Sequence, residues 1–481
     1  MRRREFLRQS GQLVIAGALA NRLEDCRLGL AAESKSVKSS RTPASGPLRV
    51  HPDNPRYFSD GNGKAVYLTG SHTWSNLPDM GSSDPPPNFD FDAYLDFLDR
   101  LNHNFIRLWT WESTRWQPGH WRPGATHTVA PHPFARTGPG NAADGKPKFD
   151  LTEYDRDYFD RLRQRLTAAG QRGIYVSVML FEGWGVQFAK RAWETHPFHP
   201  ANNVNGIDGD ANGDGKGLEI HTLTNGKVTA LQEAYVRKVV DTVGNSDNVL
   251  YEISNENHTP STPWQYHMID YIHRYESGKP KQHPVGMTFQ YKGGENRTLF
   301  ESPAEWISPN PEGGYRDNPP AADGSKVILT DTDHLWGIGG NQAWVWKSFL
   351  RGLNPLFMDP YDGTVIGNRF DPKWDPVRKS LGHTRRLAER MNLTAMTPNS
   401  KLASSGYCLA HASADEGEYL VYAPEGGKIT VDLTATSGKL EAEWFNPTKG
   451  TSTDAGPIDG DATRTFDAPF AGDAVLWLKK K

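Results

Sequence analysis

The feature that most restricts the fold of this 481-residue chain is an alternation of short apolar runs with amphipathic segments, beginning near residue 50. The apolar runs have the length and composition of buried strands, and the segments between them repeat apolar residues at helical spacing. Strands that alternate with helices pair in parallel, and eight of them suit a closed (β/α)8 TIM barrel of the α/β class. The eight strand-like runs span residues 66–69, 105–108, 174–178, 249–253, 285–289, 305–307, 327–330 and 355–358.

The segments between these runs each place apolar residues on one helical face, as Tyr94, Leu95, Leu98 and Leu101 do. An open doubly wound sheet is the alternative interpretation. It predicts a G-x-G-x-x-G after the first strand or a P-loop, and the sequence contains neither. Further helical segments span residues 158–166, 231–243, 266–275, 344–350 and 377–391.

Beyond about residue 400 the pattern changes to short alternating strands separated by glycine-rich turns, which predicts a small antiparallel β-sandwich. Its strands span residues 419–422, 429–433, 440–445 and 474–478. The predicted organisation has four parts: a signal region (1–30), a disordered linker (31–47), a catalytic (β/α)8 domain (48–397) and a β-sandwich domain (398–481).

The N-terminus predicts export. Residues 2–8 are rich in arginine, and a short apolar stretch from Leu13 to Ala20 follows. This order resembles the twin-arginine signal, and Ala18-Leu19-Ala20 offers a cleavage site. The alternative is an amphipathic cytosolic N-terminus. Because the stretch is too short to cross a bilayer, we expect a periplasmic or secreted protein, without stable membrane insertion after signal removal.

Composition narrows the class of ligand. The formal net charge of −3 provides no basic field for nucleic acid, so we expect no nucleic-acid partner. The chain has 15 tryptophans, and indole rings in loops suit the apolar faces of sugars as well as core packing. A disulfide between Cys26 and Cys408 would only tether the N-terminal tail and is not expected, so the core must hold the fold. Tryptophans in predicted loops are Trp74, Trp109, Trp111, Trp116, Trp121, Trp184 and Trp336.

Polar and aromatic residues follow the strand-like runs at the points where the runs end. In a (β/α)8 barrel these ends meet at one mouth, which carries the active site. We therefore expect a carbohydrate-binding site there, although each residue alone is equally typical of an ordinary loop. The candidate substrate contacts are His72, Trp74, Arg107, Trp109, Glu182, Asn255, His258, Gln290, His334 and Trp336.

Two carboxyl groups on opposite sides of a scissile bond are what glycosidic hydrolysis needs. Glu256 follows the fourth strand, and Asp331 and Asp333 follow the seventh, which faces the fourth across an eight-stranded barrel. We expect Glu256 to be the acid, with its pKa raised by a tryptophan-walled pocket. While the strand persists, the two aspartates point to the same face. We favour Asp331 as nucleophile or base because it lies closest to the strand end, with Asp333 as the alternative.

Two further roles complete this hypothesis. Asn255 would hydrogen-bond a sugar hydroxyl beside the reacting carbon. Arg107, on the second strand, would hold a catalytic carboxylate ionised, or it would form an ordinary salt bridge inside the barrel. Whichever of the two aspartates is not catalytic would cap a helix or pair with an arginine.

One segment has the spacing of a calcium loop, with glycine at position six and glutamate at position twelve. Its eighth position is Gly215 instead of an apolar residue, and no clear helices flank it, so an EF-hand is not expected. An isolated structural Ca2+ site and a plain Gly/Asp turn both remain open. The candidate ligands are Asp208, Asp210, Asn212, Asp214 and Glu219.

Several stretches resemble the apiosidase-like glycoside hydrolases. They are residues 54–74, 105–109, 251–256 and 331–337. The resemblance implies a clan A barrel in which Glu256 is the acid/base. The clan usually has a glutamate nucleophile where this chain has Asp331 or Asp333, so both retention and inversion through a water stay open.

Residues 419–427, 443–447 and 470–476 are similar to a module named as the collagen-binding domain of a collagenase. A collagen-degrading enzyme is nevertheless disfavoured, because the sequence has no H-E-x-x-H, G-x-S-x-G or C-x-x-C motif. The main hypothesis is an exported glycosidase that acts on a poly- or oligosaccharide and needs no cofactor for its chemistry. The alternative is a non-catalytic carbohydrate- or matrix-binding protein on a barrel scaffold.

Overall fold

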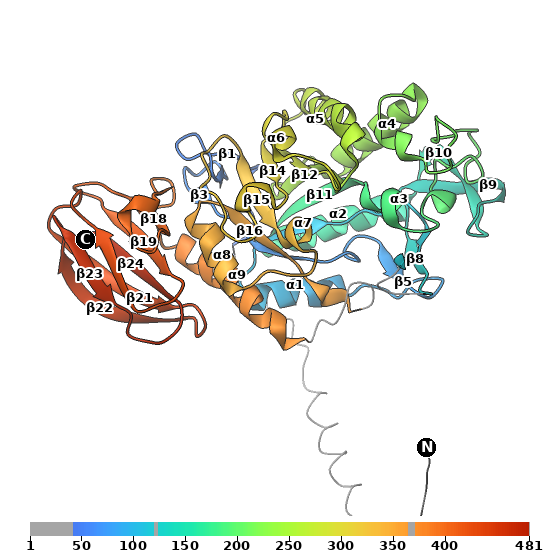
Figure 1. Cartoon of the computed structure of the whole chain (residues 1–481). Helices are drawn as coiled ribbons and strands as arrows, with labels where there is room; N and C mark the ends of the chain where they lie inside the picture. Colours follow the sequence, from blue (N-terminus) through green and yellow to red (C-terminus); the bar gives the residue numbers. More distant parts are fainter. Residues whose placement is uncertain (1–41, 120–123, 364–370, 481) are drawn as a thin grey trace, which may run out of the picture. The chain divides into compact units, whose positions relative to one another are not determined.

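The computed structural model describes residues 42–119, 124–363 and 371–480. Eight strands form one parallel sheet with the order β4-β16-β15-β14-β13-β12-β11-β6 (Figure 1). The two end strands adjoin each other, since the Asn104 amide donates to the Thr69 carbonyl at 3.0 Å. The predicted (β/α)8 barrel is therefore confirmed. The strands are β4 (Gly70–His72), β6 (Phe105–Leu108), β11 (Tyr175–Glu182), β12 (Val249–Asn255), β13 (Val285–Thr288), β14 (Trp306–Ser308), β15 (Val327–Asp331) and β16 (Asn354–Met358).

Helices lie outside this sheet and connect its strands (Figure 1). Capping side chains begin several of them: Asp90 accepts a hydrogen bond from the Ala93 amide at the start of α1, and Asp155 does the same for Tyr158 at α2. The β14–β15 connection carries the 3-10 turn η5 (Glu312–Gly314). The helices are α1 (Phe91–Arg100), α2 (Arg156–Gln171), α3 (Trp184–Phe188), α4 (Gly226–Val243), α5 (Thr262–Glu276), α6 (Asn296–Phe300), α7 (Thr332–Leu335), α8 (Gln342–Leu350) and α9 (Asp375–Ala388).

The first barrel strand differs from its prediction. We predicted residues 66–69, whereas β4 begins at Gly70 and Val66 belongs to a small antiparallel sheet, β1-β2-β3. The Asn104 side chain explains the shift, because it bonds the backbone of Tyr67 and Thr69 where strand pairing would otherwise occur. Gly70 then permits close approach, since a Cβ there would lie 2.2 Å from the Phe105 carbonyl oxygen. The small sheet comprises β1 (Arg49–Val50), β2 (Phe58–Ser59) and β3 (Ala65–Val66).

An insertion between β6 and α2 builds up one side of the barrel mouth. It contains the hairpin β9-β10, and β7 and β8 form a further sheet with β5 from the preceding connection. The strands are β5 (Asp79–Gly81), β7 (Arg115–Trp116), β8 (His127–Ala130), β9 (Phe134–Asn141) and β10 (Pro147–Tyr154).

The C-terminal strands form a six-stranded antiparallel sheet, β17-β18-β19-β24-β21-β22, and a two-stranded sheet, β20-β23. The four predicted strands correspond to β19, β20, β21 and β24. Four others, β17, β18, β22 and β23, were not predicted. Of these, β22 is largely exposed and polar, as an edge strand can be. The strands are β17 (Thr397–Pro398), β18 (Cys408–His411), β19 (Glu418–Ala423), β20 (Lys428–Asp432), β21 (Lys439–Asn446), β22 (Thr451–Asp459), β23 (Thr463–Asp467) and β24 (Ala474–Lys480).

Some predictions fall outside the described residues: the signal region 1–30 with Cys26, most of the linker 31–47, and Trp121. The described end of the linker, residues 42–47, lies against the barrel, where the Ala44 amide donates to the Gly170 carbonyl at 2.8 Å. Each helix of the described residues is too short or too polar to cross a membrane.

Candidate active site

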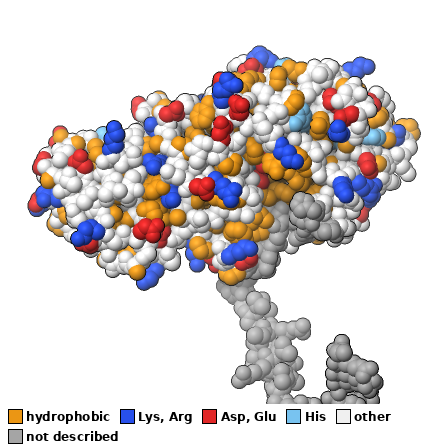
Figure 2. Space-filling model, viewed as in Figure 1, with side chains coloured by type: hydrophobic (Ala, Val, Ile, Leu, Met, Phe, Trp, Pro, Cys, Tyr) orange, Lys and Arg blue, Asp and Glu red, His pale blue; other side chains and the backbone are white. Residues whose placement is uncertain are grey.

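The barrel mouth holds a cleft of about 900 Å³ at the C-terminal ends of β12, β13, β15 and β16. Figure 2 shows hydrophobic side chains gathered between α3 and α7, with Lys or Arg side chains among them. Glu256 and Asp333 both line this cleft, so two carboxyl groups and several aromatic rings share one space. The aromatic lining residues are Trp74, Trp184, Phe289, Tyr291 and Trp336.

Glu256 directly follows β12 and is only 7 % exposed. Its backbone has φ 44°, a left-handed conformation that non-glycine residues adopt at a cost and that is common at functional sites. The Gln187 side chain donates to the Glu256 carbonyl at 2.9 Å and helps to hold it. Burial, and then the negative charge of Asp333, raise the pKa of Glu256 well above its usual range. A carboxyl group with a raised pKa keeps its proton to higher pH than an ordinary glutamate does, and it can act as an acid.

Asp331 ends β15, is 0 % exposed and does not line the cleft. One carboxylate oxygen lies 2.7 Å from His72 Nε2 and 3.0 Å from Arg107 Nη1, and the other accepts from the Asp333 amide at 3.0 Å. Although burial opposes ionisation, the hydrogen bond from His72 and the charge of Arg107 hold the pKa of Asp331 well below its usual range. This residue therefore caps α7 and belongs to a buried charge network.

Asp333 lies in the first turn of α7, is 8 % exposed and lines the cleft. The strand ends at Asp331, so a helical turn, and not the alternation of a strand, presents the Asp333 side chain. Its Oδ2 lies 3.3 Å from Arg107 Nη1. Burial raises the pKa of Asp333 to about 6, with the Arg107 charge acting in the opposite direction. Of the two aspartates, Asp333 is the one placed to meet a ligand.

Arg107 is the centre of the buried network. It donates to both oxygens of Glu252, at 2.9 and 2.5 Å, and to Asn255 Oδ1 at 2.5 Å, besides its contacts with Asp331 and Asp333. Sequence analysis did not single out Glu252, but a glutamate inside a buried strand must have a partner. Arg107 thus lies behind the cleft wall, where it links β12 and β15, the strands that precede the two carboxyl groups.

Two histidines support the same network. Trp109 Nε1 donates to His72 Nδ1 at 2.8 Å, so the proton of His72 lies on Nε2, toward Asp331. His334 Nε2 lies 3.0 Å from Asn255 Oδ1, and its Nδ1 lies 2.7 Å from the Ser308 hydroxyl. Burial and the Arg107 charge lower the pKa of His334 well below its usual range, so the ring is neutral.

The candidate substrate contacts divide into two groups. Glu182 caps α3, accepting from the Gly185 amide at 2.8 and 2.9 Å, and burial raises its pKa to about 8. His258 Nε2 lies 2.9 Å from the Leu218 carbonyl. The candidates that line the cleft are Trp74, Gln290, His334 and Trp336. Those behind its wall are His72, Arg107, Trp109, Glu182, Asn255 and His258.

The loop tryptophans divide in the same way. Trp111 and Trp116 stack at 4.9 Å between ring centroids and pack with Trp109 in a buried aromatic cluster beneath Trp74 and Trp184. Three other lining residues, Phe289, Lys292 and Arg316, were not predicted, and Tyr291 was noted only as a residue at a strand end. Phe289 and Tyr291 flank the predicted Gln290 at the end of a strand. This adjacency is the sequence feature that could have predicted them as cleft residues.

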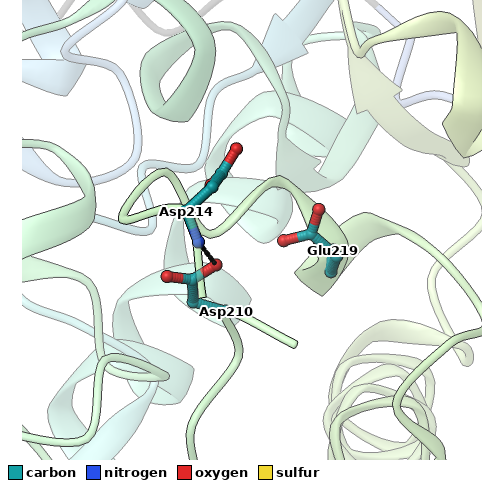
Figure 3. A group of neighbouring side chains, drawn as sticks. All are labelled: Asp210, Asp214 and Glu219. Atoms are coloured by element: carbon teal, nitrogen blue, oxygen red, sulfur yellow. Dashed lines mark hydrogen bonds between the residues drawn. The ribbon is translucent and has the colours of Figure 1, made fainter. Parts of the chain in front are cut away.

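The predicted calcium loop brings three of its five candidate ligands together. Carboxylate oxygens of Asp210, Asp214 and Glu219 lie within 4.8 Å of one another (Figure 3). Asp208 instead accepts from the Asp210 amide at 3.0 Å, and Asn212 donates to Glu219 at 2.6 Å. The oxygen donors suit Ca2+. The metal itself stays a prediction.

Two segments match known family models. Residues 113–292 match a "Domain of unknown function (DUF6298)", and residues 396–479 match the "Putative collagen-binding domain of a collagenase". The second match confirms the resemblance noted for the C-terminal strands, whereas the apiosidase-like resemblance stays a prediction. A comparison with curated proteins found no match.

Solved structures share the fold. A glycoside hydrolase family 5 protein from Bacteroides vulgatus ATCC 8482 is 13% identical, with a TM-score of 0.62 over 91% of this chain and 93% of that chain. Another structure, described as a glycoside hydrolase, is also 13% identical, with a TM-score of 0.58 over 91% of this chain and 97% of that chain.

Proposed function

We propose that this protein is an exported glycoside hydrolase that cleaves a glycosidic bond in an oligo- or polysaccharide. The observation that carries the proposal is the meeting of Glu256 and Asp333 in one aromatic-lined cleft at the barrel mouth. Similarity in fold to glycoside hydrolases agrees with it. The arginine-rich run at residues 2–8 supports export, which cell fractionation would test.

In this proposal the two carboxyl groups have different roles because their surroundings differ. Glu256, with the higher pKa, donates a proton to the leaving oxygen. Asp333 has a pKa of about 6 and is held near Arg107, so it is ionised at neutral pH. It acts as nucleophile or as the base that activates water. Trp74, Trp184 and Trp336 supply flat apolar surface for sugar rings.

The test replaces Glu256 by Gln, which keeps the shape of the side chain and removes the proton donor. We expect kcat/KM on a responsive aryl glycoside or polysaccharide to fall by at least about 10²-fold, the contribution of a general acid. Glu301→Gln is the matched control, because Glu301 is exposed at the end of α6. Unchanged activity in Glu256→Gln, or sugar binding without turnover in the unmodified protein, would contradict the proposal.

A further inference from the structure

Two cationic side chains, Lys292 and Arg316, line the same cleft as the carboxyl pair. Lys292 lies in the turn after β13, and Arg316 follows η5 in the connection from β14 to β15. Both are exposed. Within the described residues neither forms a salt bridge with a carboxylate. Their position therefore calls for an account.

Both cations lie over aromatic rings: Tyr291 and Trp336 line the cleft, and Phe188 packs against Tyr291. Lys292 Nζ is 4.7 Å from the Phe188 ring centroid and 5.9 Å from that of Tyr291. The Arg316 guanidinium carbon is 5.4 Å from the Trp336 centroid. A cation on a ring face keeps its hydrogen-bond donors available for another group. The rings thus hold the two charges at the cleft without neutralising them.

The backbone connects the Lys292 turn to the proposed acid. Lys292 has φ 53°, and the Tyr291 amide donates to the Asn257 carbonyl at 3.1 Å, one residue after Glu256. Arg316 is supported differently: Trp344 Nε1 donates to the carbonyl of the preceding Tyr315 at 3.1 Å. Both cations therefore lie on segments that hydrogen bonds anchor to the barrel domain.

The carboxyl groups of the cleft do not offset these cations. Burial favours the uncharged form of Glu256, and Asp333 already pairs with the buried Arg107. A neutral sugar would meet two positive charges with no counter-charge, whereas an anionic sugar would supply it. A guanidinium also binds carboxylate and sulfate groups through paired hydrogen bonds.

We propose that the cleft binds an anionic glycan, with Lys292 and Arg316 contacting carboxylate or sulfate groups on sugars that flank the scissile bond. This inference rests on the proposed function for the position of the bond, while binding itself can be measured without turnover. Carboxylate and sulfate present the same chemistry to the two cations, so matched probes are needed to separate them.

Binding is measured by calorimetry on full-length Glu256→Gln protein, which should retain ligand without cleaving it. One probe pair is oligogalacturonate and its methyl ester, and the other is a sulfated galactan oligosaccharide and its desulfated form. We expect one charged probe to bind about tenfold more tightly than its neutral counterpart, and this preference should shrink as salt is raised. Which pair responds identifies the group as carboxylate or sulfate.

Lys292→Gln and Arg316→Gln, made in the same background, assign the preference to residues. Each should reduce the ratio of charged to neutral affinity about threefold. Lys227→Gln is the matched control, because Lys227 is an exposed lysine on α4, remote in sequence and outside the cleft lining. It should leave the ratio unchanged.

The inference is overturned if neither charged probe is preferred, or if both cleft variants keep the preference. It is also overturned if Lys227→Gln removes the preference equally, since the effect would then be one of overall charge. Failure of the proposed function looks different: the unmodified protein would hydrolyse no glycan, while the charge preference and its loss in the variants would persist.

Discussion

Asp331 and Asp333 are two residues apart, yet their side chains have opposite surroundings. Asp331 is enclosed by His72 and Arg107, and Asp333 reaches the cleft. The sequence places both at the end of the seventh strand and cannot say where that strand stops. The change from β15 to α7 after Asp331 decides which carboxyl group a ligand can meet.

The pKa difference between Asp333 and Glu256 predicts a bell-shaped pH dependence. Activity should rise as the pH increases through about 6, because Asp333 must lose its proton to act as nucleophile or base. It should fall again at higher pH, where Glu256 loses the proton that it donates. Measuring kcat/KM against pH checks this, and an acidic limb near pH 4 would contradict the assignment of Asp333. Because Asp333 and Glu256 interact, the two apparent pKa values of the pH profile describe the pair and not either residue alone.

Arg107 should be needed for stability as well as for activity. Replacing it by Met would leave Glu252 and Asp331 buried without their cationic partner. Removing one partner of a buried ion pair costs about 3–5 kcal/mol, so the free energy of unfolding in urea should fall by that order. Arg297→Met is the control: Arg297 is largely exposed, and its change should stay within about 0.5 kcal/mol. If the two variants were equally stable, Arg107 would not be needed to stabilise the buried charge network.

At the scale of elements, a helix start can explain a polar residue that was predicted to contact substrate. Glu182 ends β11 and was a candidate substrate contact, but its carboxylate binds the Gly185 amide at the start of α3. A polar residue at a strand end can cap the next helix as readily as it can meet a ligand. The residue type alone does not distinguish the two roles. The conformation of the turn after the strand decides which role the side chain takes.

The loop from Asp208 to Glu219 carries the calcium prediction. Binding to the folded state alone stabilises it by about 2.7 kcal/mol when the ligand is at a hundredfold excess over its Kd. We therefore expect a higher Tm in millimolar Ca2+ than in EDTA. Glu219→Gln should abolish this difference, whereas Glu301→Gln should keep it. The same Tm in both solutions would leave a Gly/Asp turn as the better interpretation.

At the scale of the whole molecule, the C-terminal sheet and the barrel share apolar surface. Trp346 and Phe349 of α8 belong to one buried cluster with Leu420, Tyr422 and Phe445 of the C-terminal strands. The rings of Trp346 and Tyr422 stack with centroids 6.2 Å apart. The C-terminal strands therefore cover part of the barrel domain as well as forming their own core.

Truncation after residue 397 should expose this cluster. We expect the shortened chain to aggregate or to unfold at a lower temperature than the full chain, because a contiguous apolar patch would meet water. Size-exclusion chromatography and thermal unfolding would measure this. A truncated protein that stays monomeric with an unchanged Tm would show that the shared cluster contributes little.

The sequence by itself determined the type of fold and the mouth at which a site would form. Alternating apolar runs and helical faces imply a parallel barrel because backbone pairing and burial leave few other arrangements. The same pattern brought Glu256 and the Asp331/Asp333 pair to facing strands. These conclusions rest on period and order, which local sequence carries.

Only the tertiary structure decided which polar side chains reach the cleft. Trp109, Trp111 and Trp116 pack beneath it, while Lys292 and Arg316 enter it from connections that had no recognisable signal. A side chain's exposure depends on neighbours that are distant in sequence, and its charge state depends on the partners that burial supplies. For that reason Asp331 became part of the support and Asp333 part of the candidate active site.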